Sequence, residues 1–233
     1  MHVDHIGALG CKEIAIDTLT MAAPDLIKEV TRLERITTIK NKLPAEVSEQ
    51  LLNLEMIEAE KSYYAMPNSL HVHRELQEGD QIDIGGEMLR VIYTPGHSFD
   101  HISLLHEPSG ILIGGDILIK NGPPAITDLD QYVSSLDKLR TLSMSSVLPG
   151  HGPILTNPDE VIEQSIQRII ETDNRIIELL KSGPKSYYEI ALGFTGGRIH
   201  KGILFFMNIV DTHVKRMLKN SIVAIQHEKL ILV

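Results

Sequence analysis

The sequence holds only one cysteine, Cys11, among its 233 residues. One cysteine cannot form a disulfide within the chain, which agrees with a reducing compartment. No apolar run approaches the ~20 residues of a membrane-spanning helix. The opening residues also lack the basic start and apolar core of a secretory signal. We therefore expect a cytoplasmic protein with no membrane partner.

Basic residues are outnumbered by acidic ones in residues 1–180, and acidic residues are few from Lys181 onward. The net charge is −9, but from Lys181 onward eight Lys and Arg face only three acids, which gives +5 for that part and −14 for residues 1–180. Such asymmetry suggests two units with different partners, one of them anionic. An ordinary solvated surface explains the same charges. No patch of Arg or Lys with interleaved aromatics lies near the polar motifs described below, which argues against a single-stranded nucleic-acid groove there.

The first nine residues contain an unusual density of metal-binding side chains. His2, Asp4 and His5 fall within four positions, and the apolar, Gly-containing run Ile6–Leu9 follows at once. Imidazole nitrogens and carboxylate oxygens are ligands that zinc prefers. The alternative is a polar chain terminus without a binding role.

Three more polar residues each follow a strand-like apolar segment, in a loop shaped by Gly or Pro. They are His97 after residues 87–93, Asp116 after residues 111–113, and His151 after residues 146–148. Loops at one sheet edge are where a rigid scaffold presents functional side chains. Taken singly, each of the three could instead be a turn residue that hydrogen-bonds to the backbone.

The C-terminal part has a different pattern. Asn157 caps a long helix that starts at Pro158, and a second long helix carries an apolar face from Ile203 to Leu218. A short hairpin over residues 222–233 follows. Helix, helix and hairpin is the order of a winged helix-turn-helix. We therefore expect two domains, a catalytic domain over residues 1–156 and a linking helix with a winged-helix domain over residues 157–233.

Together the motifs resemble those of the metallo-β-lactamase superfamily in order and spacing. The matching segments are His2 with Asp4-His5-Ile6-Gly7, Thr94-Pro95-Gly96-His97-Ser98, Gly114-Gly115-Asp116 and Pro149-Gly150-His151-Gly152. The resemblance covers residues 1 to about 156, and the tail is similar to the winged-helix extension of one hydrolase branch. It implies an α+β fold, a four-layer αββα sandwich with its first strands missing, plus the small C-terminal domain.

The resemblance also implies a ligand set for two zinc ions. His2 and His97 would bind one ion, Asp4, His5 and His151 the other, and Asp116 would bridge the two. Asp4 and Asp116 are the implied catalytic carboxylates. His101 would contact the substrate or orient His97 from outside the ligand set.

The implied activity is zinc-dependent hydrolysis of a small ester, thioester, lactone or amide by metal-activated water. No separate protein nucleophile is needed, and no Ser-His-Asp arrangement is apparent. Two alternatives stay open: a two-metal nuclease acting on RNA or DNA, and a non-catalytic truncated homologue with a binding role. A homodimer is a further expectation.

The family's opening motif is His-x-His-x-Asp-His, and this sequence starts at its second position. We therefore expect a truncation inside that motif, or a true start upstream of Met1. For the 233 residues as given, we expect one tightly bound zinc ion and one weakly bound ion.

Overall fold

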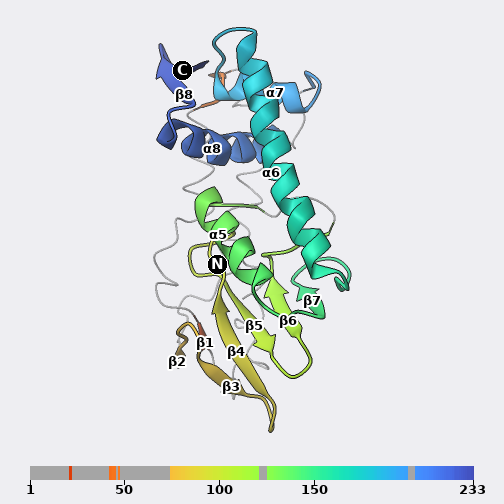
Figure 1. Cartoon of the computed structure of the whole chain (residues 1–233). Helices are drawn as coiled ribbons and strands as arrows, with labels where there is room; N and C mark the ends of the chain where they lie inside the picture. Colours follow the sequence, from red (N-terminus) through yellow and green to blue (C-terminus); the bar gives the residue numbers. More distant parts are fainter. Residues whose placement is uncertain (1–20, 23–41, 46, 48–73, 121–124, 199–202) are drawn as a thin grey trace. The chain divides into compact units, whose positions relative to one another are not determined.

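Figure 1 shows the chain, whose architecture comes from a computed structural model. The model describes residues 21–22, 42–45, 47, 74–120, 125–198 and 203–233. These residues form two compact units. Within the described chain, the first contains Met21–Ala22 and runs from Arg74 to Ile169, while the second contains Lys42–Ala45 and Val47 and continues from Ile170 to Val233. Each unit has its own hydrophobic core.

The first unit is built on a five-stranded sheet in which the strands lie in sequence order. They are β3 (Gln81–Asp83), β4 (Met88–Tyr93), β5 (Ile102–His106), β6 (Ile111–Gly115) and β7 (Ser146–Pro149). The pairs from β3 to β6 are antiparallel, and β7 pairs parallel to β6. Strands β4, β6 and β7 therefore run in one direction and end at the same edge of the sheet. A separate parallel pair joins β1 (Met21–Ala22) to β2 (Arg74–Glu75).

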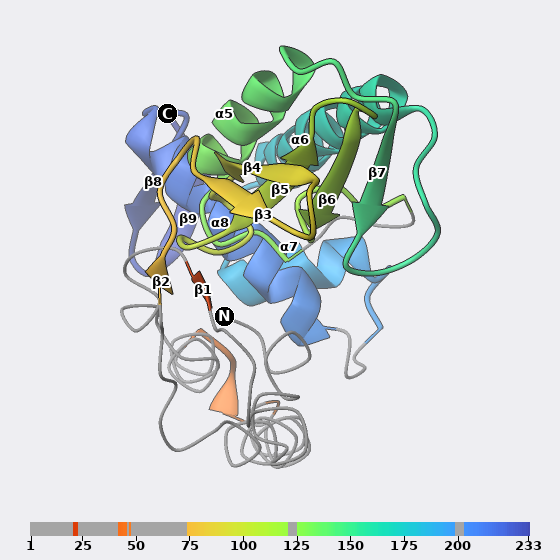
Figure 2. The ribbon, with the colours of Figure 1, turned by 90° about the horizontal axis from the view of Figure 1, so that it is seen from below.

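Helix α5 (Leu129–Arg140) and the first half of α6 (Pro158–Lys181) share the core of this sheet. Tyr132 and Leu136 of α5 are completely or almost completely buried and belong to one cluster with Val147 of β7 and Ile162 of α6. Figure 2 shows α5 lying over the sheet. Helix α5 begins where Asp128 accepts a hydrogen bond from the Gln131 N–H, a standard N-cap.

The second unit contains the remainder of α6, then α7 (Tyr187–Phe194), α8 (Ile203–Lys219) and the hairpin of β8 (Val223–Gln226) with β9 (Lys229–Leu232). A capping box starts α7, because Ser186 and Glu189 each accept a hydrogen bond from the other's backbone N–H. The core gathers Ile176, Ile190 and Val210, all fully buried.

The sequence predictions for these elements are largely confirmed. The segments expected as strands are β4, β6 and β7, and the helix expected from Pro158 is α6. The helix–helix–hairpin order of the tail is also present. The chain has a mixed α+β fold, as predicted. No helix in the described part of the chain is long and apolar enough to cross a membrane.

Candidate metal centre

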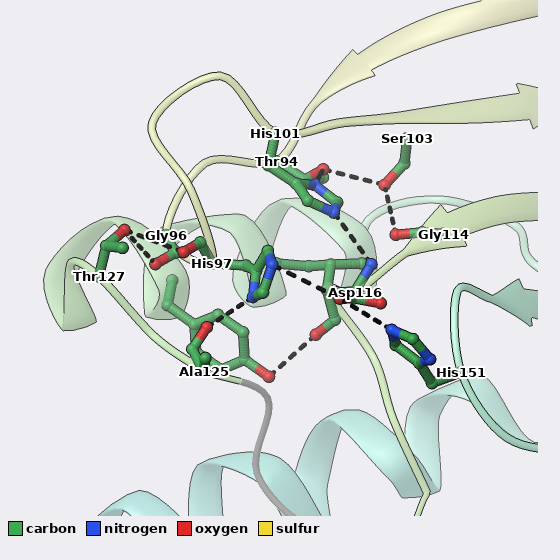
Figure 3. Close-up of polar contacts among 12 residues, drawn as sticks. Thr94, Gly96, His97, His101, Ser103, Gly114, Asp116, Ala125, Thr127 and His151 are labelled. Atoms are coloured by element: carbon green, nitrogen blue, oxygen red, sulfur yellow. Dashed lines mark hydrogen bonds and ion pairs between the residues drawn. The ribbon is translucent and has the colours of Figure 1, made fainter. Parts of the chain in front are cut away.

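Three of the residues picked out by their motifs converge at the edge where β4, β6 and β7 end (Figure 3). The Nε2 atom of His97 lies 3.5 Å from Oδ2 of Asp116, and the Nε2 atom of His151 lies 3.6 Å from the same oxygen. The side chains of His97 and Asp116 are each 5% exposed, whereas that of His151 is 52% exposed. The centre is therefore buried on the His97 side and open on the His151 side.

The two separations suit a shared metal ligand better than a hydrogen bond. An N–H···O bond spans about 2.7–3.2 Å between its heavy atoms, less than either distance here. Zinc lies about 2.0–2.2 Å from a nitrogen or oxygen ligand, so two ligands at a tetrahedral angle stand roughly 3.4 Å apart. Both separations therefore lie in the range expected between two ligands of one metal ion.

The backbone fixes which nitrogen of His97 faces the centre. Its Nδ1 atom lies 2.5 Å from the carbonyl oxygen of Ala125, and a carbonyl can only accept a hydrogen bond. Nδ1 therefore carries the proton and donates it. In the neutral ring the lone pair is then on Nε2, the atom directed at Asp116. A carbonyl that holds the outer nitrogen in this way is a usual partner of a metal-binding histidine.

The loop that carries His97 is attached to the start of α5. The hydroxyl of Thr127 donates to the carbonyls of Gly96, at 2.9 Å, and His97, at 3.0 Å. The N–H groups of Thr127 and Asp128 also donate to the Gly96 carbonyl. The N-terminus of α5 thus determines where the His97 loop lies.

His101 lies beside the centre, in contact with the backbone of Asp116 and with the ring of His97. Its ring stands edge-on to that of His97, with the ring centroids 5.7 Å apart. The backbone N–H of Asp116 donates to its Nε2 atom at 3.1 Å. The expectation that His101 contacts the substrate or orients His97 stays a prediction.

The other predicted ligands, His2, Asp4 and His5, lie outside the described residues. Within the part of the chain that the structure describes, no group of three or more His, Cys, Asp or Glu side chains is complete enough to hold a metal ion. His97 and His151 each approach Asp116, but the centre needs further ligands to close. Two imidazoles and a carboxylate are donor types that divalent metal ions bind in proteins.

Sequence reasoning missed the residues that hold these side chains in place. Ala125 acts only through its carbonyl, which no sequence pattern reveals. Thr127 had a usable signal, since it directly precedes Asp128, which caps the amphipathic segment of α5. Thr94 and Ser103 have buried hydroxyl groups near the centre, and nothing in the sequence marked either of them as functional.

The chain is similar in sequence to curated proteins that are named as beta-lactamase-like proteins and as thioesterases. The chain is 32% identical over 106 residues to the Beta-lactamase-like protein 2 homolog of Caenorhabditis elegans, which covers 46% of this chain and 36% of that protein. It is 29% identical over 105 residues to an atrochrysone carboxyl ACP thioesterase of Aspergillus fumigatus, covering 45% of this chain and 33% of the relative. The matched segment thus spans only about a third of these relatives' length.

The fold has solved counterparts over most of its length. A metallo-beta-lactamase family protein of Thermus thermophilus superimposes with a TM-score of 0.71 at 19% identity, covering 92% of this chain and 71% of that one. A beta-lactamase domain protein of Burkholderia ambifaria gives 0.70 at 19% identity, covering 84% and 60%. At these identities the likeness concerns the fold alone. The profile of the Metallo-beta-lactamase superfamily matches residues 1–151, and the chain belongs to that superfamily.

Proposed function

We propose that this member of the metallo-beta-lactamase superfamily is a zinc-dependent hydrolase whose metal centre includes Asp116 as a shared ligand. The observation that carries the proposal is the single Asp116 oxygen that stands 3.5 Å from His97 Nε2 and 3.6 Å from His151 Nε2. These distances support a carboxylate oxygen that shares metal ligation with both histidines. His2 would complete the His97 side, and Asp4 with His5 would complete the His151 side.

The residues of the centre have distinct roles in this proposal. His97, Asp116 and His151 would hold metal ions, which would lower the pKa of a water to make it a nucleophile and would polarise the carbonyl group of the substrate. The fixed tautomer of His97 keeps Nε2 directed at the centre, and the burial of Asp116 keeps its carboxylate dry, which strengthens its attraction for cations. Half-exposed His151 marks the side from which the substrate approaches.

The substrate class that we propose rests on two exposed apolar side chains close in sequence to the predicted ligands. Phe99 and Ile154 are 51% and 61% exposed, and they lie two and three residues from His97 and His151 along the chain. Ligand sites combine apolar side chains with a few polar groups, and we infer that these two side chains contact a partly apolar substrate. We propose an acyl ester or thioester, in keeping with the relative whose name is a thioesterase. Lactones and amides remain within the same chemistry.

We propose that the first unit is a four-layer sandwich and that the second unit, the C-terminal tail, is of winged-helix type. We propose that this tail is structural or dimerising. Four of its eight Lys and Arg residues lie in ion pairs within the chain, Lys181–Glu178, Lys215–Asp211, Arg216–Asp173 and Lys229–Glu189. A basic surface that binds phosphates needs uncompensated charge. A sub-micromolar complex with duplex DNA at physiological salt would contradict this assignment.

Turnover of a substrate panel tests the activity. The zinc-loaded chain should hydrolyse short and medium acyl thioesters and p-nitrophenyl esters, with rates that change little between 50 and 300 mM salt. Asp116→Ala should abolish that turnover, while His106→Ala, which alters a histidine bound to Glu87 and Ser109 away from the centre, should not. Rapid cleavage of RNA together with no acyl hydrolysis would favour the nuclease instead.

A further inference from the structure

A chain of hydrogen bonds, called the circuit below, runs from the backbone N–H of Asp116 through His101, Thr94 and Ser103 to the carbonyl of Gly114 (Figure 3). The backbone N–H of Asp116 lies 3.1 Å from Nε2 of His101, and Nδ1 of His101 lies 2.8 Å from Oγ1 of Thr94. The Thr94 hydroxyl is 2.9 Å from that of Ser103, which in turn is 3.3 Å from the carbonyl oxygen of Gly114. The circuit therefore leaves and re-enters the chain within the turn Gly114–Asp116.

Chemistry fixes the direction of every bond in this circuit. A backbone N–H only donates, so Nε2 of His101 accepts, and the ring proton is on Nδ1. Nδ1 then donates to Thr94, whose own proton is free to go to Ser103. The Ser103 hydroxyl donates to the Gly114 carbonyl, which can only accept.

Burial makes the circuit costly to break. Thr94 and Ser103 are completely buried, so water does not replace a lost partner easily. The lack of a side chain at Gly115 leaves room for the His101 ring. Gly115 has a φ of +53°, and a Cβ atom there would lie 2.8 Å from Nε2 of His101. Any side chain at position 115 would collide with the imidazole that binds the next residue.

We propose that His101 is a positioning residue that holds the main chain of Asp116 and thereby places Oδ2 between His97 and His151. Its Nε2 atom is committed to the Asp116 N–H, so that atom is neither a metal ligand nor a contact for the substrate. The proposal rests on the assignment of Asp116 as the shared ligand. In this proposal His101 orients Asp116, and not His97 as the sequence led us to expect.

Two amide substitutions separate the two ends of the ring. The side-chain amide of glutamine reaches the position of Nε2, so His101→Gln keeps an acceptor for the Asp116 N–H. The amide of asparagine reaches only the position of Nδ1, so His101→Asn keeps the bond to Thr94 and loses the bond to Asp116. We expect His101→Gln to bind zinc within about threefold of the unaltered chain, and His101→Asn to bind about 10-fold or more weakly. Equal affinities of the two variants, or the reverse order, would overturn the proposal.

Two NMR measurements on the metal-free chain test the circuit independently of metal binding. In ¹⁵N-labelled protein, the His101 ring should show the tautomer with its proton on Nδ1, and its signals are assigned by their loss in His101→Gln. The Asp116 amide should exchange slowly with solvent in the unaltered chain and in His101→Gln, and faster in His101→Asn. A proton on Nε2, or equal exchange in all three proteins, would refute the positioning role. If the unaltered chain bound no zinc while both NMR results held, the proposed function would fail and the circuit to Asp116 would stand.

Discussion

A Cβ atom on Gly96 would lie 2.4 Å from the backbone nitrogen and Cα of Tyr132. The loop before His97 therefore touches the backbone of α5 directly, with no side chain between them. Gly96 also has φ +132°, which side chains rarely adopt. The Thr-Pro-Gly-His motif thus has a packing reason for its glycine as well as a chemical reason for its histidine.

We predict that Gly96→Ala destabilises the first unit by about 3 kcal/mol or more, because the methyl group must push α5 away while the backbone is strained. Urea denaturation measures the loss. Gly79→Ala is the matched control, since Gly79 also has a positive φ, +83°, but nothing lies within 4 Å of its Cβ position. We expect about 1 kcal/mol for the control. Equal losses would show that the contact with Tyr132 is unimportant.

Thr127 provides a second test of how the His97 loop is held. Thr127→Val keeps the shape of the side chain but removes the hydroxyl that donates to the carbonyls of Gly96 and His97. We predict about 10-fold weaker zinc binding for Thr127→Val, within the usual range for residues that orient a ligand. Thr127→Ser keeps the hydroxyl and should bind zinc as the unaltered chain does. Calorimetric titration with zinc compares them, and a serine variant as weak as the valine variant would refute the role of the hydroxyl.

The sequence was sufficient to predict strands β4, β6 and β7 and the polar residues that follow them. Apolar runs that stop at a Gly- or Pro-shaped loop indicate where a strand ends, and His97, Asp116 and His151 follow such runs. Their convergence depends on β4, β6 and β7 running in one direction, which is a property of the pairing and not of any single segment. The family resemblance supplied that information.

Other features were not predicted, in one case despite a usable signal and in another because the sequence carries none. Helix α5 was missed although Asp128 caps it and Leu129, Tyr132 and Leu136 recur at helical spacing. The carbonyl of Ala125 contributes through backbone geometry, which side-chain identity does not encode. The predicted domain boundary between residues 156 and 157 remains a prediction.

Tyr132 gives a prediction for alkaline pH. Burial raises the pKa of its hydroxyl above the ordinary value of 10, and the hydroxyl donates to the Ile117 carbonyl at 2.9 Å. Because the unfolded chain ionises this group near pH 10 and the folded chain does not, its contribution to stability is complete below pH 10 and is lost as the pH rises further.

We therefore expect Tyr132→Phe to be about 1 kcal/mol less stable than the unaltered chain at pH 8, owing to the lost hydrogen bond. Between pH 9 and 11 the unaltered chain should lose about 1 kcal/mol more than the variant, so the difference should shrink. Urea denaturation at the three pH values measures both. A difference that stays constant or widens with pH would contradict the assignment to Tyr132.

The central claim is that Asp116 is a ligand shared by two metal ions. Elemental analysis of zinc after dialysis against a mild chelator tests it directly, on the unaltered chain and on the variants Asp116→Ala, His151→Ala and His106→Ala. The account predicts that Asp116→Ala loses the most zinc, that His151→Ala loses less because it strips one ion, and that His106→Ala retains the zinc content of the unaltered chain. Retention of that content by Asp116→Ala would contradict the claim.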